Sequence, residues 1–245
     1  MNTVDTVVLL HSPLTSATAW GRWPTVLREA GLDVVVPEVL DDDVPPYAGR
    51  YVGRVAVQLR EVLGTKPCLL VAHSGAGPLV PQVGFARHAA GARVTGYVLL
   101  DAMLPRALRA ATRLELMRVD DEPFAVELES ALRRGERFPD WSDGDLREVI
   151  PDDSDRTLLL AGLRPRTLDF FTEPLPLHED WPDAPVGYIR LSDPYDPSVR
   201  TARQRGWPVV VRESNHFAAV TDPGLVSAAL FELFDHLFAE TATPH

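Results

Sequence analysis

Ser74 lies in a run of small residues that directly follows an apolar segment. Residues 72–77 read Ala-His-Ser-Gly-Ala-Gly, and the segment before them, Cys68–Val71, is apolar. Such a short apolar run predicts a buried strand. Pro78 predicts the first turn of a helix, where its missing N–H is not needed. A chain that turns at once from strand to helix leaves room only for small neighbours and strains the turning residue, whose side chain projects above the sheet. This context predicts a serine positioned to act as a nucleophile.

A nucleophilic serine needs a base that removes its proton and an acid that orients the base. His216 follows the last apolar run of the chain, after the small polar residues Ser214 and Asn215. Aspartates follow the two apolar runs before it. The chain therefore contains the three residue types that this chemistry requires, each close to the end of a predicted strand.

Apolar runs that alternate with helical segments predict the elements that hold these side chains. The predicted strands span residues 6–10, 33–36, 68–71, 96–100, 186–191 and 208–211. Helices are predicted over residues 24–30, 48–63, 78–89 and 223–239, with a short one ending at 205. Tyr51, Val55, Leu59 and Val62 predict the buried face of the second helix. Strand–helix–strand alternation implies right-handed crossovers, so we expect an α/β fold with a mostly parallel central sheet flanked by helices.

Residues 105–184 interrupt this alternation. Four helices are predicted there, over residues 123–134, 145–149, 153–163 and 165–171, and no strand is predicted. Asp152 or Asp153 is expected to cap the third of these helices. The chain thus divides into a core formed by residues 1–104 and 185–245, and an all-helical insertion of residues 105–184.

These features together resemble the α/β-hydrolase superfamily. Residues 72–76 resemble its nucleophile elbow, with Ala72 and Ala76 where the family pattern usually has glycine. The helical insertion resembles the cap, or lid, of this family. The family carries a triad in the chain order Ser, Asp, His, each residue at the carboxyl end of a strand, and ligands of open α/β sheets bind at that edge.

The resemblance assigns the triad to Ser74, His216 and an aspartate. Ser74 is expected to attack a carbonyl, and His216 to act first as general base and then as general acid. Asp196, which precedes Pro197, best matches the position of the family's acid. Asp193 is an alternative, and Asp101 is another, because some relatives carry the acid after the preceding strand.

The loop after the first strand departs from the family pattern. The family reads His-Gly-x, where the backbone N–H of x helps to bind the oxyanion, whereas this chain reads His11-Ser12-Pro13, and proline has no N–H. Gly75 is expected to supply the first oxyanion donor. The second is either the Leu14 N–H, in a shifted loop, or the Ser12 hydroxyl, or the hole has one donor. Losing one donor costs on the order of 10²–10³ in turnover.

Composition excludes several classes of partner. The chain of 245 residues has 35 acidic and 24 basic side chains, a formal net charge of −11, which argues against nucleic acid and anionic membranes. Cys68 is the only cysteine, so neither a disulfide framework nor a cysteine metal cluster is possible. No apolar run reaches the ~18–20 residues of a membrane span, and the N-terminus lacks a basic signal-like segment. We expect a cytoplasmic protein with a small-molecule substrate and no nucleic-acid or membrane partner; its oligomeric state is not predicted.

The expected function is that of a serine hydrolase acting on a small, largely apolar ester, thioester or amide through an acyl-enzyme on Ser74. His11, Trp141 and Phe217 are expected to line the substrate pocket. No cofactor and no metal are expected, and the run 41–43 of three aspartates predicts a solvated loop or helix cap, because adjacent carboxylates splay apart. Pro13 motivates an alternative, a lyase or cyclase of the same fold that uses the triad as general base. A third possibility is a ligand-binding protein without turnover.

Overall fold

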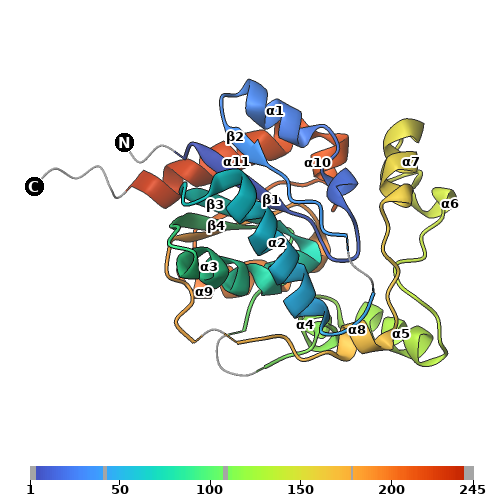
Figure 1. The fold of residues 1–245 in the computed structure, drawn as a ribbon. Coiled ribbons are helices and arrows are strands. Elements are labelled where there is room, and N and C mark those ends of the chain that lie inside the picture. Colours follow the sequence, from blue (N-terminus) through green and yellow to red (C-terminus); the bar gives the residue numbers. More distant parts are fainter. Residues whose placement is uncertain (1–3, 41–42, 107–109, 178, 240–245) are drawn as a thin grey trace, which may run out of the picture.

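One six-stranded parallel sheet forms the centre of the protein (Figure 1). The computed structural model describes residues 4–40, 43–106, 110–177 and 179–239. The strands are β1 (Thr6–Leu10), β2 (Asp33–Val35), β3 (Cys68–His73), β4 (Val94–Leu100), β5 (Val186–Arg190) and β6 (Val209–Val211). Their order in the sheet is β2-β1-β3-β4-β5-β6, and every neighbouring pair is parallel. The predicted parallel sheet is confirmed.

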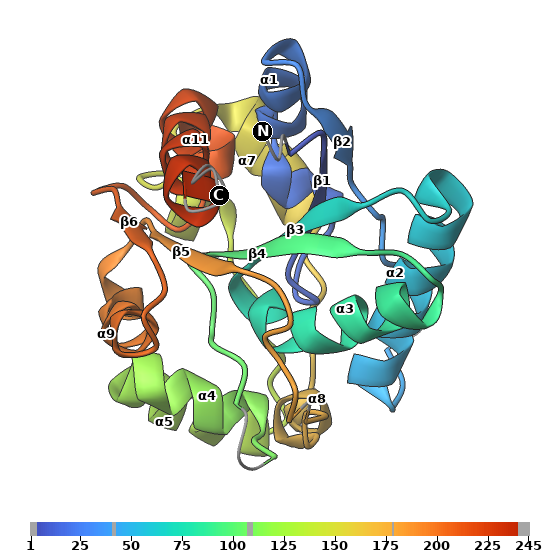
Figure 2. The ribbon, with the colours of Figure 1, turned by 90° about the vertical axis from the view of Figure 1, so that its left-hand side faces the viewer.

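Helices cover both faces of the sheet, as Figure 2 shows. One face packs against α1 (Trp23–Glu29) and α11 (Pro223–Phe238). The other packs against α2 (Tyr47–Leu63), α3 (Val80–Ala89) and α9 (Asp196–Gln204). Because side chains alternate along a strand, Val7 of β1 faces the first layer and Val8 the second. All five residues of β1 are buried, as expected of a strand that is covered on both faces.

Two predicted helices differ in detail from the observed ones. Val62 of α2 is 64% exposed, whereas Leu63 is buried. The buried row of α2 repeats every four residues from Tyr47 to Leu63, and the fourth step reaches Leu63 rather than Val62 because residues four apart form one ridge on a helix surface. The helix predicted from residue 78 is preceded by a 3₁₀ segment, η2 (Ser74–Leu79), and becomes α-helical only at Val80.

The insertion between β4 and β5 contains five α-helices in its described residues, and no strand. They are α4 (Arg113–Asp120), α5 (Glu122–Arg133), α6 (Asp143–Leu146), α7 (Asp153–Ala161) and α8 (Leu168–Thr172). The sequence did not predict α4, whose buried positions include a charged residue, Arg113, and lack a clear apolar period. Thr112 and Glu115 form a capping box at its start. Of the two proposed caps of α7, Asp152 is the one observed.

The insertion packs on the core at two separate places. Its helices α6 and α7 contact η1 (Ala17–Trp20) and α10 (Ala218–Thr221) through a shared apolar cluster. Its helices α4, α5 and α8 form a second cluster with Leu14 and Tyr47. In Figure 1, these two groups of helices lie apart from each other. The insertion therefore spans the end of the sheet at which Ser74 lies.

Polar contacts tie the insertion to two loops of the core. Arg166, which is buried, donates to Asp43 Oδ1 at 2.8 Å and to the Pro13 carbonyl at 3.2 Å. The Arg164 amide donates to the Leu14 carbonyl at 2.8 Å. Asp43 also pairs with the insertion's Arg137, and it lies in a loop with 34% of its side chain exposed. Asp41 and Asp42 lie outside the described residues.

The turn after Ser74 is crowded by the neighbouring strand's loop. A Cβ placed on Gly77 would lie 2.2 Å from the Met103 carbonyl oxygen. A backbone atom cannot move aside as the end of a side chain can, so only glycine fits at this position.

Within the described residues, no helix is both long and apolar enough to cross a membrane.

We predict that Gly77→Ala destabilises the protein by about 2 kcal/mol or more, because the added methyl group overpacks a rigid turn. Gly53→Ala is the matched control, since a Cβ at this exposed position of α2 meets nothing within 4 Å. Alanine should there stabilise the helix by about 0.5–1 kcal/mol. Thermal unfolding followed by circular dichroism measures both changes. Equal melting temperatures of the two variants would contradict the crowding described for the turn.

Candidate active site

Ser74 occupies the tight turn between β3 and η2 that its sequence context predicts. Its φ angle is +57°, a left-handed conformation that is unfavourable for any residue with a Cβ. Strain of this kind persists only where the surroundings impose it, and it is common at functional sites. Ser74 lines a cavity of about 290 Å³ at the carboxyl end of the sheet.

His216, in the loop after β6, lines the same cavity and is held by Asp101. Its Nδ1 lies 3.0 Å from Oδ2 of Asp101, which directly follows β4 and is fully buried. Asp101 Oδ1 accepts the backbone N–H groups of Leu191 and Ser192 at 2.7 and 3.1 Å, and Oδ2 also accepts the Ser192 hydroxyl. Burial alone would raise the pKa of Asp101, but these hydrogen bonds outweigh it and hold that pKa below its ordinary value. Asp101 is therefore ionised at neutral pH.

Asp196, the expected partner of His216, does not contact it. Asp196 Oδ1 accepts from Nε of Arg190 at 2.9 Å, and Asp193, the second choice, also pairs with Arg190. The Arg190 guanidinium is buried at the end of β5 and binds Glu213 as well. Both aspartates thus neutralise a buried cation. The expected contact between Asp196 and His216 is therefore wrong, and the aspartate that contacts His216 is Asp101, the last of the three alternatives, after the strand adjacent to that of Ser74.

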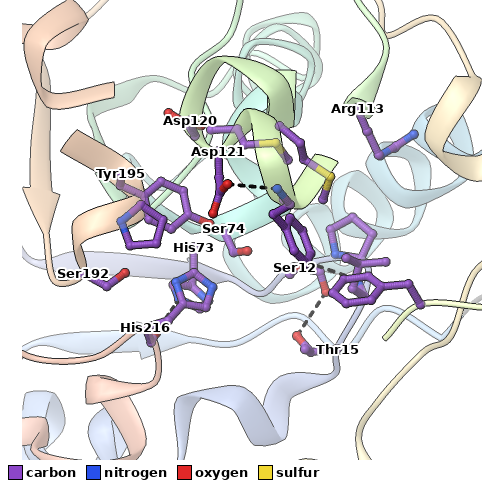
Figure 3. A pocket seen from close by; sticks show the side chains of 18 of the residues that line it. Ser12, Thr15, His73, Ser74, Arg113, Asp120, Asp121, Ser192, Tyr195 and His216 are labelled. Carbon is purple, nitrogen blue, oxygen red and sulfur yellow. Dashed lines mark hydrogen bonds between the residues drawn. The ribbon is translucent and has the colours of Figure 1, made fainter. Parts of the chain in front are cut away.

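The imidazole of His216 packs against two other rings, those of His73 and Tyr195 (Figure 3). The His73 ring is 4.3 Å away, and its Nε2 donates to the His216 carbonyl at 2.9 Å. Burial, and secondarily the proximity of His216, lowers the pKa of His73 to about 3, so His73 is neutral and does not compete for a proton. The Tyr195 ring stacks on the His216 ring at a centroid distance of 5.3 Å and an interplanar angle of 8°. The stack and the Asp101 hydrogen bond together fix the orientation of His216.

Tyr195 also brings its hydroxyl to Ser74, a contact that was not predicted from the sequence. Figure 3 shows the hydroxyl pointing towards the serine side chain. Burial, and then the charge of Asp101, raises the pKa of Tyr195 above its ordinary value, while a hydrogen bond with the Ser74 side chain opposes this shift. The Tyr195 hydroxyl is therefore protonated at neutral pH. Its position between Pro194 and Asp196 gave no motif by which to single it out.

The loop after β1 distinguishes between the candidate oxyanion donors. The Leu14 N–H donates to Ser12 Oγ at 3.3 Å, so this amide is already engaged. Ser12 Oγ lies 2.9 Å from the point where a Cβ of Gly75 would be. Its oxygen accepts from Leu14, which leaves the hydroxyl proton to be donated elsewhere. Ser12 Oγ and Gly75 therefore lie side by side at the cavity.

His11 was expected to line the cavity, but it lies behind the loop instead. Its Nδ1 is 2.9 Å from the Ser12 carbonyl, and its Nε2 accepts the Val39 amide at 3.3 Å. Burial lowers the pKa of His11, so the ring is neutral, with Nδ1–H as donor to Ser12. His11 holds the loop in place rather than contacting a ligand, which corrects the expectation.

Apolar side chains form most of the cavity wall, and the expected Trp141 and Phe217 are among them. The others are Pro13, Leu14, Met103, Met117, Phe124, Phe138, Phe170, Pro194 and Tyr195. Most of those beyond residue 105 belong to the helical insertion. Arg113, also part of the wall, stacks over Phe170 at 3.9 Å and donates to its carbonyl at 2.8 Å. A ligand in this cavity would be enclosed by core and insertion together.

Two carboxylates at the turn between α4 and α5 also line the cavity. Asp121 caps α5 by accepting the Phe124 amide at 3.0 Å, and Asp120 accepts the Ser198 hydroxyl at 2.7 Å. Burial raises the pKa of Asp120 to about 6, against the opposing effect of the Ser198 hydrogen bond. Neither aspartate was predicted to lie near the site, because α4 itself was not predicted.

A family model described as the alpha/beta hydrolase family matches residues 7–229, nearly the whole chain. The chain belongs to the alpha/beta hydrolase family. No protein of curated function matches the sequence.

Several solved structures share the α/β-hydrolase fold of this chain. An extracellular alpha/beta-hydrolase from a Paenibacillus species is 15% identical with a TM-score of 0.73, covering 93% of this chain and 98% of its own. Tomato methylketone synthase I is 13% identical with a TM-score of 0.70, covering 96% and 99%. Polyneuridine aldehyde esterase is 16% identical with a TM-score of 0.69, covering 95% and 100%. At these identities the likeness concerns the fold.

We predict that Asp120→Asn stabilises the protein at pH 7.5 but hardly at pH 4. The pKa of Asp120 rises on folding from the ordinary 3.8 to about 6. The contribution of protonated Asp120 to the folding stability of the wild type is therefore fully present below about pH 4 and is lost as the pH rises through about 6. Asparagine does not titrate, so the variant does not lose stability in this range. Melting temperatures at both pH values measure the effect. Asp121→Asn, which removes the same charge next to it, is the control; an equal gain for Asp120→Asn at both pH values would contradict the shift.

Proposed function

We propose that the protein is a serine hydrolase that cleaves a small, largely apolar ester, thioester or amide through an acyl-enzyme on Ser74. The observation that carries the proposal is the strained Ser74 in one cavity with His216, whose Nδ1 is hydrogen-bonded to the buried Asp101. An ionised Asp101 favours the tautomer of His216 that has its proton on Nδ1, which leaves Nε2 free to accept a proton. This is the arrangement of residue types that activates a serine hydroxyl.

The reaction would proceed in two halves. His216 Nε2 takes the hydroxyl proton as Ser74 Oγ attacks the carbonyl carbon, and the carbonyl oxygen becomes an oxyanion. When the intermediate collapses, the bond to the leaving group breaks, and His216 gives that group its proton. Water then attacks the acyl-enzyme by the same steps, releasing the acid and restoring Ser74. Asp101 stabilises the imidazolium during both halves and keeps its own charge.

The oxyanion would be bound by the Gly75 N–H and the Ser12 hydroxyl. This assignment rests on the closeness of Ser12 Oγ to Gly75 and on the engagement of the Leu14 amide within the loop. A side-chain hydroxyl can replace a backbone N–H as an oxyanion donor, since donors of either kind serve in such holes. Pro13 is then compatible with acyl transfer, because the residue before it supplies the missing donor.

The cavity indicates the size and polarity of the substrate. A volume of about 290 Å³ is at the lower end of the range for small-molecule sites. The wall is formed mainly by methionine, proline and aromatic side chains, so an acyl or alcohol group without charge fits best. The structure of polyneuridine aldehyde esterase shares the fold, which is consistent with an ester as substrate.

A lyase or cyclase reaction remains the second candidate. It is motivated by Pro13, and tomato methylketone synthase I, which has the same fold, forms complexes with 2-tridecanone and, as a variant, with β-ketoheptanoate. Such chemistry uses His216 as a base without an acyl-enzyme. Covalent labelling of Ser74 therefore distinguishes it, and equally a non-catalytic ligand-binding protein, from the hydrolase.

We predict that a fluorophosphonate adds once to the wild-type protein, at Ser74, because an activated serine displaces fluoride from phosphorus. Intact mass spectrometry should show one adduct in the wild type and none in Ser74→Ala or His216→Ala. A folded wild-type protein that forms no adduct would overturn the acyl-transfer proposal in favour of the second candidate or of ligand binding.

We further predict that Asp101→Asn lowers the turnover of an ester substrate by roughly 10³–10⁴-fold with little change in KM, because the amide no longer favours the required tautomer of His216. Asp196→Asn, at the position first expected from the sequence, is the matched control and should retain activity. Steady-state kinetics on variants whose folding is checked by circular dichroism decides between them. A larger loss in Asp196→Asn would refute the role proposed for Asp101.

A further inference from the structure

The residues around Ser74 approach it from two opposite sides. The sheet order places β1 on one side of β3, and β4 and then β5 on the other. Ser12 follows β1, so the proposed oxyanion donors lie on the first side. Tyr195 follows β5, and its ring stacks on His216 with nearly parallel planes, so its hydroxyl lies on the second side, beside Ser74 (Figure 3).

The side of His216 is also the side of the leaving group. In the proposed mechanism, His216 must protonate the leaving atom, which therefore departs on that side of the tetrahedral carbon. The Tyr195 hydroxyl, which points towards the Ser74 side chain in Figure 3, lies close to the atom at which the substrate carbon will be attached. The Tyr195 O–H group therefore faces the bond between the substrate carbon and the leaving group.

The stability of an alkoxide leaving group depends strongly on such a donor. As the bond to the substrate carbon breaks, negative charge grows on the leaving oxygen, and a poised hydrogen-bond donor stabilises that charge. A nitrophenolate spreads its charge over the ring and gains little, whereas a simple alkoxide gains much. Arg113, at the other end of the cavity from His216 in Figure 3, cannot take this part.

We propose that Tyr195 is a further catalytic residue, whose hydroxyl donates a hydrogen bond to the leaving-group oxygen and so allows the enzyme to cleave unactivated alkyl esters. Proton transfer itself stays with His216, and Tyr195 keeps its proton throughout. This inference rests on the proposed function, since it concerns the same acyl-transfer step. It adds a preference: the substrate class includes esters of simple alcohols, not only activated esters.

The test is the kinetic response of Tyr195→Phe to the leaving group. The substrates are butyrate esters of p-nitrophenol, phenol, trifluoroethanol and ethanol, which share one acyl group and hence one deacylation step. We expect kcat/KM of the variant to fall roughly 10–100-fold for the ethyl ester and no more than about threefold for the p-nitrophenyl ester. The dependence of kcat/KM on leaving-group pKa thus becomes steeper.

Two controls separate this role from a structural one. Tyr97→Phe removes a hydroxyl that donates to Asp183 at 2.7 Å, outside the cavity, and should leave the whole series unchanged. Labelling by the fluorophosphonate, whose fluoride is a good leaving group, should proceed in Tyr195→Phe within about threefold of the wild-type rate. Phenylalanine keeps the ring stacked on His216, so a loss through misplacement of His216 would slow labelling and all esters alike.

The possible outcomes are distinct. A steeper leaving-group dependence with near-normal labelling supports the role of Tyr195. An equal loss for all four esters, or no loss, overturns this inference while leaving the serine hydrolase in place. A wild-type protein that neither forms the adduct nor hydrolyses any ester overturns the proposed function, and this inference with it.

Discussion

A buried carboxylate that must be paired organises the candidate site. Asp101 has no exposed surface, and a charge in such a position is tolerated only when hydrogen bonds replace its lost hydration. Those hydrogen bonds come from the loop after β5 and from His216 after β6, so one side chain joins the ends of three neighbouring strands. The position of the imidazole is therefore determined by the loops that follow these three strands at this edge of the sheet.

The parallel sheet explains why residues so distant in the sequence meet there. Every strand of the sheet is parallel to its neighbours, and each of the loops after β1, β3, β4, β5 and β6 contributes at least one polar group to the cavity or to its support. The core supplies all of the proposed chemistry. The insertion supplies much of the apolar wall, so the reaction type and the choice of substrate belong to different parts of the chain.

The placement of Ser74 and His216 at one cavity could be predicted because their surroundings are local. Small residues around Ser74 and a loop position for His216 are visible within a few residues of sequence. The aspartate that contacts His216 could not be predicted in this way, because Asp101, Asp193 and Asp196 all follow strands. What separates them is Arg190, a buried cation that attracts two of the three. Likewise, α4 escaped prediction because Arg113 is buried by stacking on Phe170, a contact between distant residues.

The contacts of Arg164 and Arg166 with the loop after β1 have a mechanical consequence. The insertion holds the carbonyls of Pro13 and Leu14, on either side of the amide that positions the Ser12 hydroxyl. A movement that lifted this part of the insertion from the core would remove these two contacts and leave the loop held by His11, through the Ser12 carbonyl. Opening the cavity in this way would therefore also loosen the proposed oxyanion donors, so that the wall and the donors depend on the same contacts.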